Sequence, residues 1–498
     1  MKRNVVVAGW GQITQPKDID GPVLDPLGLM HEASLRAAIR AGSADILTEL
    51  DAVMVVRTLS RHYISPAHEL KDRLDSTARL THVSGIGGNS PQTLINMAAG
   101  MIARNELDCV LIAGAEAYVQ REPESIKTQN ALFRGIPPDY PEDDIRGATD
   151  LEAAHGMEYP MQGFPLFETA LWAESGMDIR SYLMKTAQMW SEFSKTAAAN
   201  PHAWSKSART AEEIITPGPC NRMIAFPYTK YMNAFVNVDQ GAAVILMSEQ
   251  PAEKYAAKDR RTVYFLGGGY AVDRQRFMIE KSDFTASPPL KAAVSKALKR
   301  SSMSIDELEC FDFYSCFPCA VSIAKKMTGI KDNDPRPLTL AGGLGFFGGP
   351  GNNYSLHSVA ALAEKISTGK RSNGLVTALG WFMHKHAAGI YGCRPLTTDM
   401  KNHDIEDMKN PLAGDRPVRI VEQASGTGMI ETYTIIYRRD MQPDYALIYG
   451  RTCDSLRFIA RTRSDPEIFR LLATTCMVGA KVKLEFDSSC NMNIAEPV

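Results

Sequence analysis

Two regions of this chain repeat the same order of helices and strands, and this duplication limits the fold more than any other feature. In the first region a segment with helical periodicity, ASLRAAIRAG (33–42), precedes the apolar run LDAVMVV (50–56). In the second region LKAAVSKALKRS (290–301) precedes LECFDFY (308–314) in the same way. The repeat continues with a helix and a strand at 92–104 and 108–116, matched by 354–368 and 374–380, and with a closing strand at 241–248, matched by 386–392.

Each copy therefore has the order β-α-β-α-β. A unit of this kind that occurs twice predicts an α/β protein with two similar doubly wound sheets packed face to face. We place the first half at residues 1–260 and the second half at residues 261–400. The short apolar run that follows residue 4 is typical of a first strand rather than of a signal peptide.

An insertion interrupts the first half between two of its strands, at about residues 117–230. It contains the turn-rich segment GIPPDYPEDD (135–144) and long helical runs such as SYLMKTAQMWSEFSKTAAA (181–199). Large insertions usually cross the surface and carry specificity, so we expect this one to contribute to a ligand site. The alternative is a scaffold loop without a ligand.

The last segment, residues 412–498, has a different pattern. IETYTIIYRRD (430–440), YALIYGR (445–451) and LRFIARTR (456–463) show β-branched and aromatic alternation between short polar turns, and GAKVKLEF (479–486) adds a further strand. Short strands without a long helix predict a small β-barrel of the oligonucleotide/oligosaccharide-binding (OB) type. That fold alone does not identify a ligand.

The charge and cysteine content narrow the class of protein. Charged residues make up 22% of the chain and the net charge is -2, without the basic stripe that indicates nucleic-acid binding. No stretch approaches the roughly 20 apolar residues of a membrane span. The nine cysteines are scattered and odd in number, which favours reduced thiols. We therefore expect a cytoplasmic protein without nucleic-acid or membrane partners.

Several blocks of sequence occur in an order that is similar to that of thiolases. GIGGNSPQTLINMAAGMIARNELDCVLIAGAEAY (85–118) resembles the part of a thiolase that carries its nucleophilic cysteine, although no cysteine stands in the loop. Further resemblances are CNRMIAFPYTKYM (220–232), VDQGAAVILMSEQPAEK (238–254), AGGLGFFGGPGNN (341–353) and SNGLVTALG (372–380). Residues 1–395 thus resemble the thiolase superfamily, and this resemblance implies a duplicated thiolase fold with five αβαβα layers.

The C-terminal segment carries a second resemblance. GTGMIETYTIIYRRD (426–440) and VGAKVKLEF (478–486) are similar to the barrel of small acyl-CoA-binding partner proteins, without their zinc ribbon. A thiolase-like body with such a barrel resembles the thiolase-like proteins of type 1, which have an additional C-terminal domain, and acetyl-CoA acetyltransferase-like proteins. The resemblance implies a coenzyme A thioester as substrate or ligand, no covalently bound cofactor, and a role in lipid metabolism.

The resemblance also locates the catalytic groups of the family, and all four are replaced here. The acyl-carrying cysteine falls at Gly88 and the second cysteine at Ala378, while the two histidines fall at Tyr314 and Gly349. Acyl transfer through a cysteine needs a thiolate and a neighbouring base. We therefore predict that ordinary thiolase turnover has been lost.

Three kinds of side chain near these positions could still carry chemistry. Tyr314 could act as a general acid or, with a lowered pKa, as a base, as tyrosines do in similar thiolase-like aldolases; alternatively it is an aromatic plug. His384 and His386 lie beside the lost second cysteine, where at most one is expected to face the cavity, and either could be a packing residue instead. Cys316 precedes a predicted helix N-terminus that would lower its pKa, unless it is a buried, inert thiol.

The loops at the four positions supply candidates for ligand binding. Glycines allow backbone N–H groups to approach a thioester carbonyl or a pantetheine amide closely, although a flexible connector is the alternative. The predicted substrate-binding residues are Gly88, Asn89, Ser90, Gly342, Gly343, Gly348, Gly349, Ala378 and Gly380. Cys316 and Cys319 form an isolated C-x-x-C, so we predict no metal site. The candidate cations for the phosphates of coenzyme A are Arg222, Lys291, Lys296, Lys299 and Arg300.

Three functions remain open at this point. The first is an acyl-CoA-binding protein that is nominally an acyltransferase but has its cysteine and histidine machinery replaced. The second is retro-aldol or lyase-type cleavage of a β-hydroxyacyl-CoA with Tyr314 as the acid–base group. The third is a non-catalytic acyl-CoA carrier, or a partner of another thiolase-like subunit. The expected partners are acyl-CoA and either a second copy of the chain or such a subunit.

Overall fold

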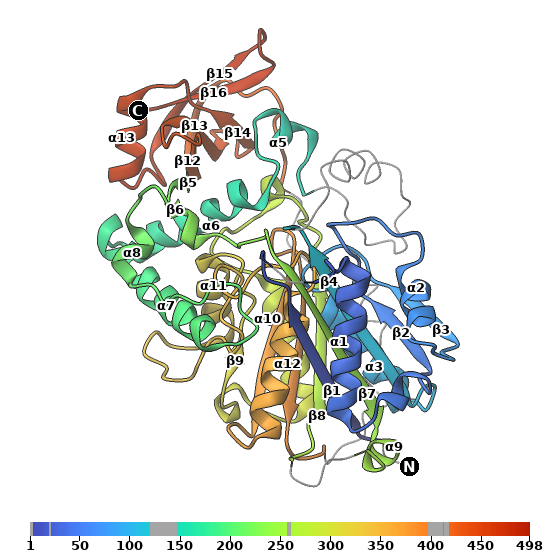
Figure 1. The fold of residues 1–498 in the computed structure, drawn as a ribbon. Helices are drawn as coiled ribbons and strands as arrows, with labels where there is room; N and C mark the ends of the chain where they lie inside the picture. Colours follow the sequence, from blue (N-terminus) through green and yellow to red (C-terminus); the bar gives the residue numbers. More distant parts are fainter. Residues whose placement is uncertain (1–2, 19–20, 120–146, 256–259, 397–411, 413–417) are drawn as a thin grey trace.

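The computed structural model describes residues 3–18, 21–119, 147–255, 260–396, 412 and 418–498 (Figure 1). The first half of the duplication starts with β1 (Val5–Thr14) and closes with β7 (Asp239–Ser248) and the short helix α9 (Glu249–Glu253). Between them lie α1 (Pro26–Ala41), the 3-10 helix η1 (Ala44–Leu47), β2 (Ala52–Val55), α2 (Pro66–Arg73), β3 (Leu80–Val83), α3 (Ser90–Ala103) and β4 (Cys109–Ala117).

The second half repeats this order from β8 (Tyr264–Val272) to β11 (Lys385–Gly392). Between them lie η3 (Met278–Glu280), α10 (Pro288–Ser301), η4 (Ile305–Glu307), β9 (Phe311–Asp312), α11 (Pro318–Thr328), α12 (Tyr354–Ser367) and β10 (Asn373–Gly380). The strand order of the resulting sheet is β3-β2-β4-β7-β1-β8-β11-β10-β9. Apart from β3, the strands of the second half follow in the reverse order of the equivalent strands of the first half.

The two half-sheets are joined along one edge and separated by helices elsewhere. β1 and β8 pair only through Val5 with Phe265 and Val6 with Tyr264. Helices α3 and α12 contact each other and strands of both half-sheets, whereas α1 covers the outer face of the first half and α10 that of the second. These are the five αβαβα layers predicted from the sequence, and the duplicated fold is confirmed.

Paired glycines explain how the outer helices come so close to the sheet. A Cβ atom on Gly9 of β1 would stand 2.0 Å from the carbonyl oxygen of Ala37 in α1. A Cβ atom on Gly269 of β8 would stand 1.9 Å from the carbonyl oxygen of Ala293 in α10. Glycine in a strand interior often marks such a close approach of another backbone. In both halves the outer helix therefore packs on a glycine of the sheet in the same way, in addition to the shared order of elements.

The insertion forms a cover over one end of the body. Its described part contains α5 (Asp150–Ala154), α6 (Pro160–Ser175), α7 (Ile179–Ala199), α8 (Ala211–Ile215), β5 (Met223–Ala225), β6 (Tyr228–Thr229) and η2 (Lys230–Met232). The segment GIPPDYPEDD lies outside the described residues. Helix α7 packs on the glycine-rich segment 341–353, because a Cβ atom on Gly342 would stand 2.5 Å from Cα of Ala197.

The C-terminal segment folds into a closed five-stranded barrel, as predicted. Its elements are β12 (Gly426–Tyr437), β13 (Pro443–Thr452), β14 (Arg457–Arg461), α13 (Pro466–Thr474), β15 (Lys481–Asp487) and β16 (Met492–Pro497). The barrel closes in the order β13-β14-β16-β15-β12 because β12 also pairs with β13. The short helix α13, whose buried residues include Phe469 and Leu472, was not predicted from the sequence.

The barrel lies at one end of the molecule, with α5 beside it and α6 below it (Figure 1), and it is docked on both the insertion and the body. The N–H of Phe226, next to β5, donates a hydrogen bond to the Ile435 carbonyl of β12 at 2.8 Å. The hydroxyl of Tyr449 donates to Glu152 at 3.0 Å, and the guanidinium of Arg457 donates to the carbonyls of Ile279 and Lys281. Within the described ranges, no helix combines the length and the apolar character that a membrane span requires.

Candidate functional site

Gly88 and Tyr314 face each other at the centre of the candidate site. Gly88 lies in the turn between β3 and α3, Tyr314 follows β9, and both residues are buried. A Cβ atom at position 88 would stand 2.0 Å from the hydroxyl oxygen of Tyr314 and 2.4 Å from its Cζ atom. Nonbonded atoms do not approach so closely. The tyrosine therefore occupies the space that any side chain at position 88 would need.

The end of β10 meets the same turn from the other half of the molecule. A Cβ atom on Gly380 would stand 2.3 Å from Oδ1 of Asn89 and 2.6 Å from Cγ of Lys385. Ala378 is fully buried in β10, opposite Ala387 of β11. Two of the loops that the sequence analysis selected are thus brought together, and glycine at position 380 is required by their close approach.

Lys385 is a site residue to which the sequence analysis gave no role. Its side chain is buried, and its Nζ atom donates a hydrogen bond to the carbonyl oxygen of Ile86 at 2.7 Å. Its Cε atom lies 3.0 Å from where a Cβ atom on Gly87 would stand. A buried ammonium group next to the turn links the two halves at this point. The signal available in the sequence was its position between His384 and His386.

Asn89 presents an acceptor that the described part of the protein leaves unused. Its Oδ1 atom is buried, and no described residue donates a hydrogen bond to it. Its Nδ2 atom is 3.4 Å from the hydroxyl of Thr93. Buried acceptors are nearly always paired with protein, water or a ligand. The amide oxygen of Asn89 is therefore available to an N–H group of a ligand or to a water molecule. The neighbouring Ser90 hydroxyl donates to the Gly85 carbonyl and supports the turn.

Several backbone N–H groups of the glycine-rich segment 341–353 donate hydrogen bonds to other groups of the protein. Fewer of them are therefore free to bind a ligand than we expected. The N–H of Gly342 donates to Thr339 Oγ1, that of Gly343 to the Tyr354 hydroxyl, and that of Gly349 to the Phe235 carbonyl. Gly348, at φ 120°, packs against Gln240 and makes no hydrogen bond through its N–H to any described residue. Of the four predicted glycines here, only Gly348 retains a donor for a ligand.

Tyr354 and Asp312 place this segment beside Tyr314. The rings of Tyr314 and Tyr354 meet edge to face at 5.7 Å between centroids. The buried carboxyl group of Asp312 accepts hydrogen bonds from the N–H groups of Leu340 and Ala341. Burial raises the pKa of Asp312, and these donors act against that shift. Sequence reasoning missed both supporting residues, because their role depends on contacts between distant segments.

Burial also determines the protonation of the central groups. It raises the pKa of Tyr314 far above its usual value, with a smaller contribution from Cys316, so the phenol is protonated at neutral pH. A protonated phenol can donate a hydrogen bond or a proton but is a poor base. Burial likewise raises the pKa of Cys316, although this thiol precedes α11. The expected lowering by the helix N-terminus is overcome by desolvation, because Cys316 is buried.

The histidine pair, of which we expected at most one member to face the cavity, lies beside Ser287 and Lys281. His386 Nε2 lies 3.1 Å from the hydroxyl of Ser287, and the positive charge of Lys281 acts on both His384 and His386. Alternate residues of a strand share a face, so Lys385 points the opposite way and reaches Gly380. Burial lowers the pKa of His386 to about 3 and that of His384 well below its usual value. Both imidazoles are neutral.

The cations suggested for coenzyme A phosphates lie apart from this centre. Lys291, Lys296, Lys299 and Arg300 belong to α10 on the outer layer, where Lys296 and Arg300 donate to carbonyls of β8. Arg222 donates to the carbonyl of Met223 in the insertion. No cluster of three or more potential metal ligands occurs among the described residues.

The chain is similar over nearly its whole length to one solved structure. That structure is the crystal structure of a monomeric SCP2-thiolase-like protein type 1 from Mycobacterium smegmatis. The identity is 31%, 99% of each chain is covered, and the TM-score is 0.81. Residues 407–489 match the family described as the additional C-terminal domain of thiolase-like protein type 1.

Two further solved structures share the fold of the body at low identity. An aldolase described as Ltp2-ChsH2(DUF35) is 17% identical, with a TM-score of 0.60 over 78% of this chain and 98% of the other. An acetyl-CoA acetyltransferase from Syntrophomonas wolfei is 13% identical, with a TM-score of 0.56 over 79% of this chain and 99% of the other. No curated protein matches the chain.

Proposed function

Because the chain belongs to the SCP2-thiolase-like proteins of type 1, we propose that it binds an acyl-CoA thioester without transferring the acyl group through a cysteine. The fold supports a ligand of the thiolase type, while the four catalytic positions of that family hold Gly88, Tyr314, Gly349 and Ala378. Every described cysteine near the centre is buried, and burial raises the pKa of Cys316 and Cys319. Nucleophilic catalysis needs the thiolate, which this environment disfavours.

The observation that carries the proposal is the position of the Tyr314 hydroxyl against Gly88. Thiolases hold the reacting thioester next to the residue at this position, and here a protonated phenol stands there instead. Such a phenol is suited to donate a hydrogen bond to a thioester carbonyl, and the unused Asn89 oxygen is suited to accept one from a pantetheine amide. The two groups together would bind the functional groups of an acyl-CoA without a covalent step.

Calorimetric titration with acetyl-CoA and longer acyl-CoA thioesters tests this proposal. The Tyr314→Phe variant removes only the hydroxyl, so we expect thioester affinity to fall by about tenfold, which corresponds to one hydrogen bond in a buried site. Tyr433→Phe is the matched control, because that buried hydroxyl donates to the Leu472 carbonyl within the barrel. Absence of binding by the wild-type protein, or equal affinities for all three proteins, would rule the proposal out.

Retro-aldol cleavage of a β-hydroxyacyl-CoA is the second candidate function. In this reaction the bond between the α and β carbons breaks, a base takes the proton of the β-hydroxyl, and an acid returns a proton to the α carbon. Protonated Tyr314 suits the acid role, and His384 and His386 are neutral, although their lowered pKa values make them weak bases. One structure with the same fold is described as an aldolase, and it shares the fold alone.

Mass spectrometry of the acyl-CoA pool separates the two functions. Cleavage would convert a β-hydroxyacyl-CoA into a shorter acyl-CoA and a carbonyl compound, without release of free coenzyme A. If this occurs, Tyr314→Phe should lower the rate by at least ~100-fold while thioester affinity changes much less. Unchanged acyl-CoA in the presence of saturable binding would favour the non-catalytic carrier.

The third candidate function, as a partner of another thiolase-like subunit, depends on the oligomeric state of the protein. The relative from Mycobacterium smegmatis is described as monomeric. We propose that this chain binds its thioester without a second thiolase-like subunit. Light scattering of the purified protein during thioester titration tests this proposal. If a partner or a second copy is required, the isolated monomer will not bind the thioester.

A further inference from the structure

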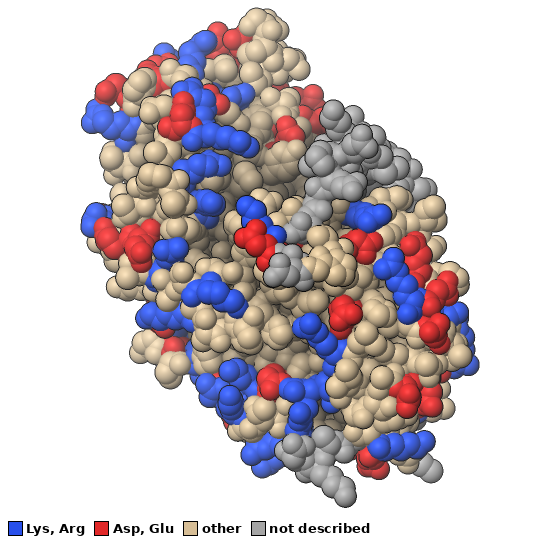
Figure 2. Space-filling view, viewed as in Figure 1, with Lys and Arg blue, Asp and Glu red and all other residues tan. Residues whose placement is uncertain are grey.

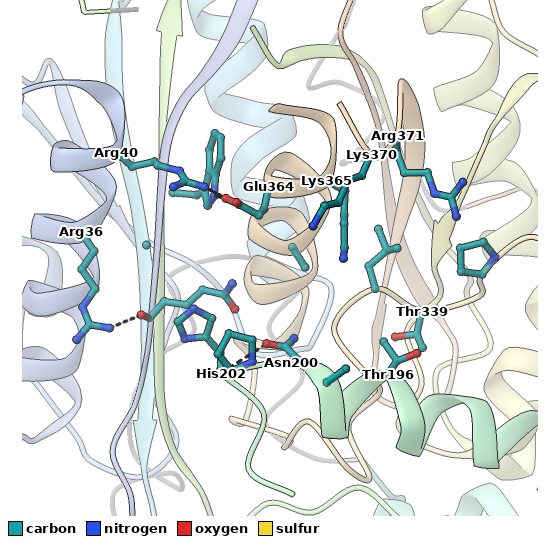
Figure 3. A pocket seen from close by; sticks show the side chains of 18 of the residues that line it. Arg36, Arg40, Thr196, Asn200, His202, Thr339, Glu364, Lys365, Lys370 and Arg371 are labelled. Carbon is teal, nitrogen blue, oxygen red and sulfur yellow. Dashed lines mark hydrogen bonds and ion pairs between the residues drawn. The ribbon is translucent and has the colours of Figure 1, made fainter. Parts of the chain in front are cut away.

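A second site is indicated by a large basic cavity on the far side of the glycine-rich segment (Figure 3). The cavity has a volume of about 950 Å³ and lies between α1, the end of α7 and the end of α12. Six cationic side chains line it and Glu364 is the one acidic residue among its lining residues. The cations are Arg36, Arg40, Arg260, Lys365, Lys370 and Arg371.

Five of these six cations form no ion pair with a described residue, and only Arg40 does, with Glu364. Lys365, Lys370 and Arg371 are three of these five. They come from the end of α12 and the turn after it, and in Figure 3 they lie across the cavity from Arg36 and Arg40 of α1. Like charges that converge on one cavity repel each other unless an anion lies between them. The arrangement is therefore costly when empty and favourable when an anion is bound.

Arg40 differs from the other five cations because it is paired with an anionic residue of the described chain. Its guanidinium pairs with Glu364, yet its Nε atom is buried and receives no hydrogen-bond partner from the described residues. Burial and the nearby charge of Arg260 both lower its pKa. A buried guanidinium donor without an acceptor is uncommon in folded proteins.

The floor of the cavity is built from ordered polar and aromatic groups. Trp10, Gln12 and Thr339 are buried there, and Asn200 and His202 stand at its side. The indole N–H of Trp10 donates to Glu364 at 3.2 Å, and the guanidinium of Arg36 donates to the Gln12 carbonyl at 2.8 Å. These contacts fix the walls before any ligand arrives, which limits the entropy that binding must overcome.

We propose that this cavity binds a small molecule that carries a diphosphate, such as a nucleoside diphosphate. A diphosphate brings several negative charges into a compact volume, and arginine and lysine are the usual donors to phosphate oxygens. The volume is large enough for an attached nucleoside beside the floor residues. The same chemistry is present in the phosphorylated ADP half of coenzyme A, so the ligand has two sources that an experiment must separate.

The cavity is distinct from the site around Tyr314. Thr339 and Leu340 form part of its wall, and the same residues are held from the other side by Asp312. Asn200, at the edge of the cavity, donates to the carbonyl of Ala341 at 2.9 Å. The segment 339–341 therefore separates the two sites. The proposal goes beyond thioester binding at Tyr314 and does not depend on it.

The alternative is an ordinary solvated basic surface. Figure 2 shows that lysine and arginine side chains gather over the half of the molecule that contains α12, whereas acidic and basic side chains alternate over the barrel. A solvated surface would bind anions weakly and without regard to their shape. A built site would prefer a diphosphate to a single phosphate at equal ionic strength.

Calorimetric titration of the full-length protein with ADP, pyrophosphate and inorganic phosphate tests the proposal. We expect ADP and pyrophosphate to bind at one site per chain, at least tenfold more tightly than phosphate, with an affinity that falls as salt is added. The triple variant Lys365→Gln, Lys370→Gln, Arg371→Gln should weaken ADP binding by at least tenfold. The single variant Lys370→Gln, at an exposed turn, should weaken it by a smaller factor and guards against misfolding of the triple variant.

A matched control removes the same charge elsewhere. The triple variant Lys331→Gln, Lys481→Gln, Arg439→Gln lowers the net charge by the same amount at exposed positions outside the cavity. It should leave ADP binding unchanged. If wild type shows no saturable binding of ADP or pyrophosphate, or if the control weakens binding as much as the triple variant does, the proposal is wrong and the surface is merely basic.

Competition identifies the source of the diphosphate. If coenzyme A displaces ADP and the triple variant weakens both, the cavity binds the nucleotide half of coenzyme A. If coenzyme A or its thioester binds together with ADP, and the triple variant affects ADP alone, the cavity serves a free nucleotide. Failure of thioester binding in Tyr314→Phe, with ADP binding intact, would concern only the site around Tyr314.

Discussion

The hydroxyl oxygen of Tyr314 lies 2.0 Å from the point that a Cβ atom on Gly88 would occupy. The two residues belong to different halves of the duplicated fold, and the resemblance to thiolases predicts a histidine and the acyl-carrying cysteine at their positions. One replacement thus fills the space that the other vacates. A nucleophile cannot be restored at position 88 while the tyrosine keeps its place.

A double-mutant cycle measures this coupling. In the wild-type background Gly88→Ala should lower the free energy of unfolding by about 1–3 kcal/mol, because the new methyl group overpacks the site. In the Tyr314→Leu background the same change should cost much less. Gly218→Ala is the control, since no atom lies within 4 Å of a Cβ at that position. Denaturant unfolding of the four proteins gives the coupling, and equal costs in both backgrounds would contradict the packing argument.

We expect the protein to lack thiolysis of acetoacetyl-CoA. Removal of a catalytic nucleophile typically lowers turnover by about 10⁶-fold, and neither Gly88 nor Ala378 can act as one. Gly88→Cys should not create activity, because the thiol would collide with Tyr314. The measurement is the loss of acetoacetyl-CoA absorbance in the presence of coenzyme A. Turnover typical of enzymes in the wild-type protein would be incompatible with this interpretation.

Stability should fall on acidification because buried neutral histidines must be protonated when the chain unfolds. Burial lowers the pKa of His357 and His386 to about 3, below the usual value of about 6.5. A histidine whose pKa is lowered in the folded protein makes its full contribution to the free energy of unfolding above pH 6.5. This contribution is lost as the pH falls toward 3. The slope is up to about 1.4 kcal/mol per pH unit for each histidine.

The variant His386→Gln separates the contribution of one histidine from that of buried carboxyl groups, whose effect on the pH dependence of stability has the opposite sign. Burial raises the pKa of Asp312 and Glu168, and their protonation in the folded protein therefore opposes the effect of the histidines as the pH falls. The variant should show a shallower loss of stability between pH 6.5 and 4.5 than wild type. His68→Gln, at an exposed position, should follow wild type. Parallel curves for His386→Gln and wild type would mean that His386 is not held neutral by burial.

Arg457 should be the most important single contact between the barrel and the body. Its side chain is fully buried, pairs with Glu431 at 2.7 Å and donates to the carbonyls of Ile279 and Lys281. Arg457→Leu should lower the free energy of unfolding by about 2–3 kcal/mol, because it leaves these acceptors without a donor. Arg451→Gln, which removes a more exposed partner of Glu431, should cost less than about 1 kcal/mol. Equal effects of the two variants in thermal unfolding would argue against a docking role.

Lys385 should position the loops of the candidate site rather than stabilise the whole fold. Lys385→Met removes the donor to the Ile86 carbonyl and should weaken acyl-CoA binding by about tenfold. Lys296→Met is a matched control, because that lysine also donates to a backbone carbonyl but lies on the outer helix α10. Calorimetry on both variants provides the test. Similar losses of affinity would assign the effect to general destabilisation.

Much of the fold could be predicted because it is recorded in local patterns. The periods of 3.6 and 2 residues locate α1, α10, β4 and β10, since these periods reflect which side chains are buried on one face. The alternation after residue 426 located the barrel for the same reason. The short helix α13 escaped notice because it spans only nine residues between two strands of that barrel.

The candidate site was predicted less completely, because its properties depend on what surrounds each residue. Cys316 precedes a helix, which suggested an acidic thiol, but its burial reverses the shift. The pair His384 and His386 drew attention for its chemistry, whereas strand alternation directs Lys385 to the loops. The cations of the second site come from separate segments, so neither their spacing nor their composition indicated a cavity.

The sequence by itself determined that the fold is duplicated, that it ends in a barrel, and that the cysteines of the thiolase family are absent from their loops. These features depend on residue type and periodicity, which are local. Only the tertiary structure decided that Tyr314 fills the space beside Gly88, that the central thiols and imidazoles are uncharged, and that six cations surround one cavity. Steric exclusion, desolvation and charge repulsion act between atoms that are close in space, whatever their separation along the chain.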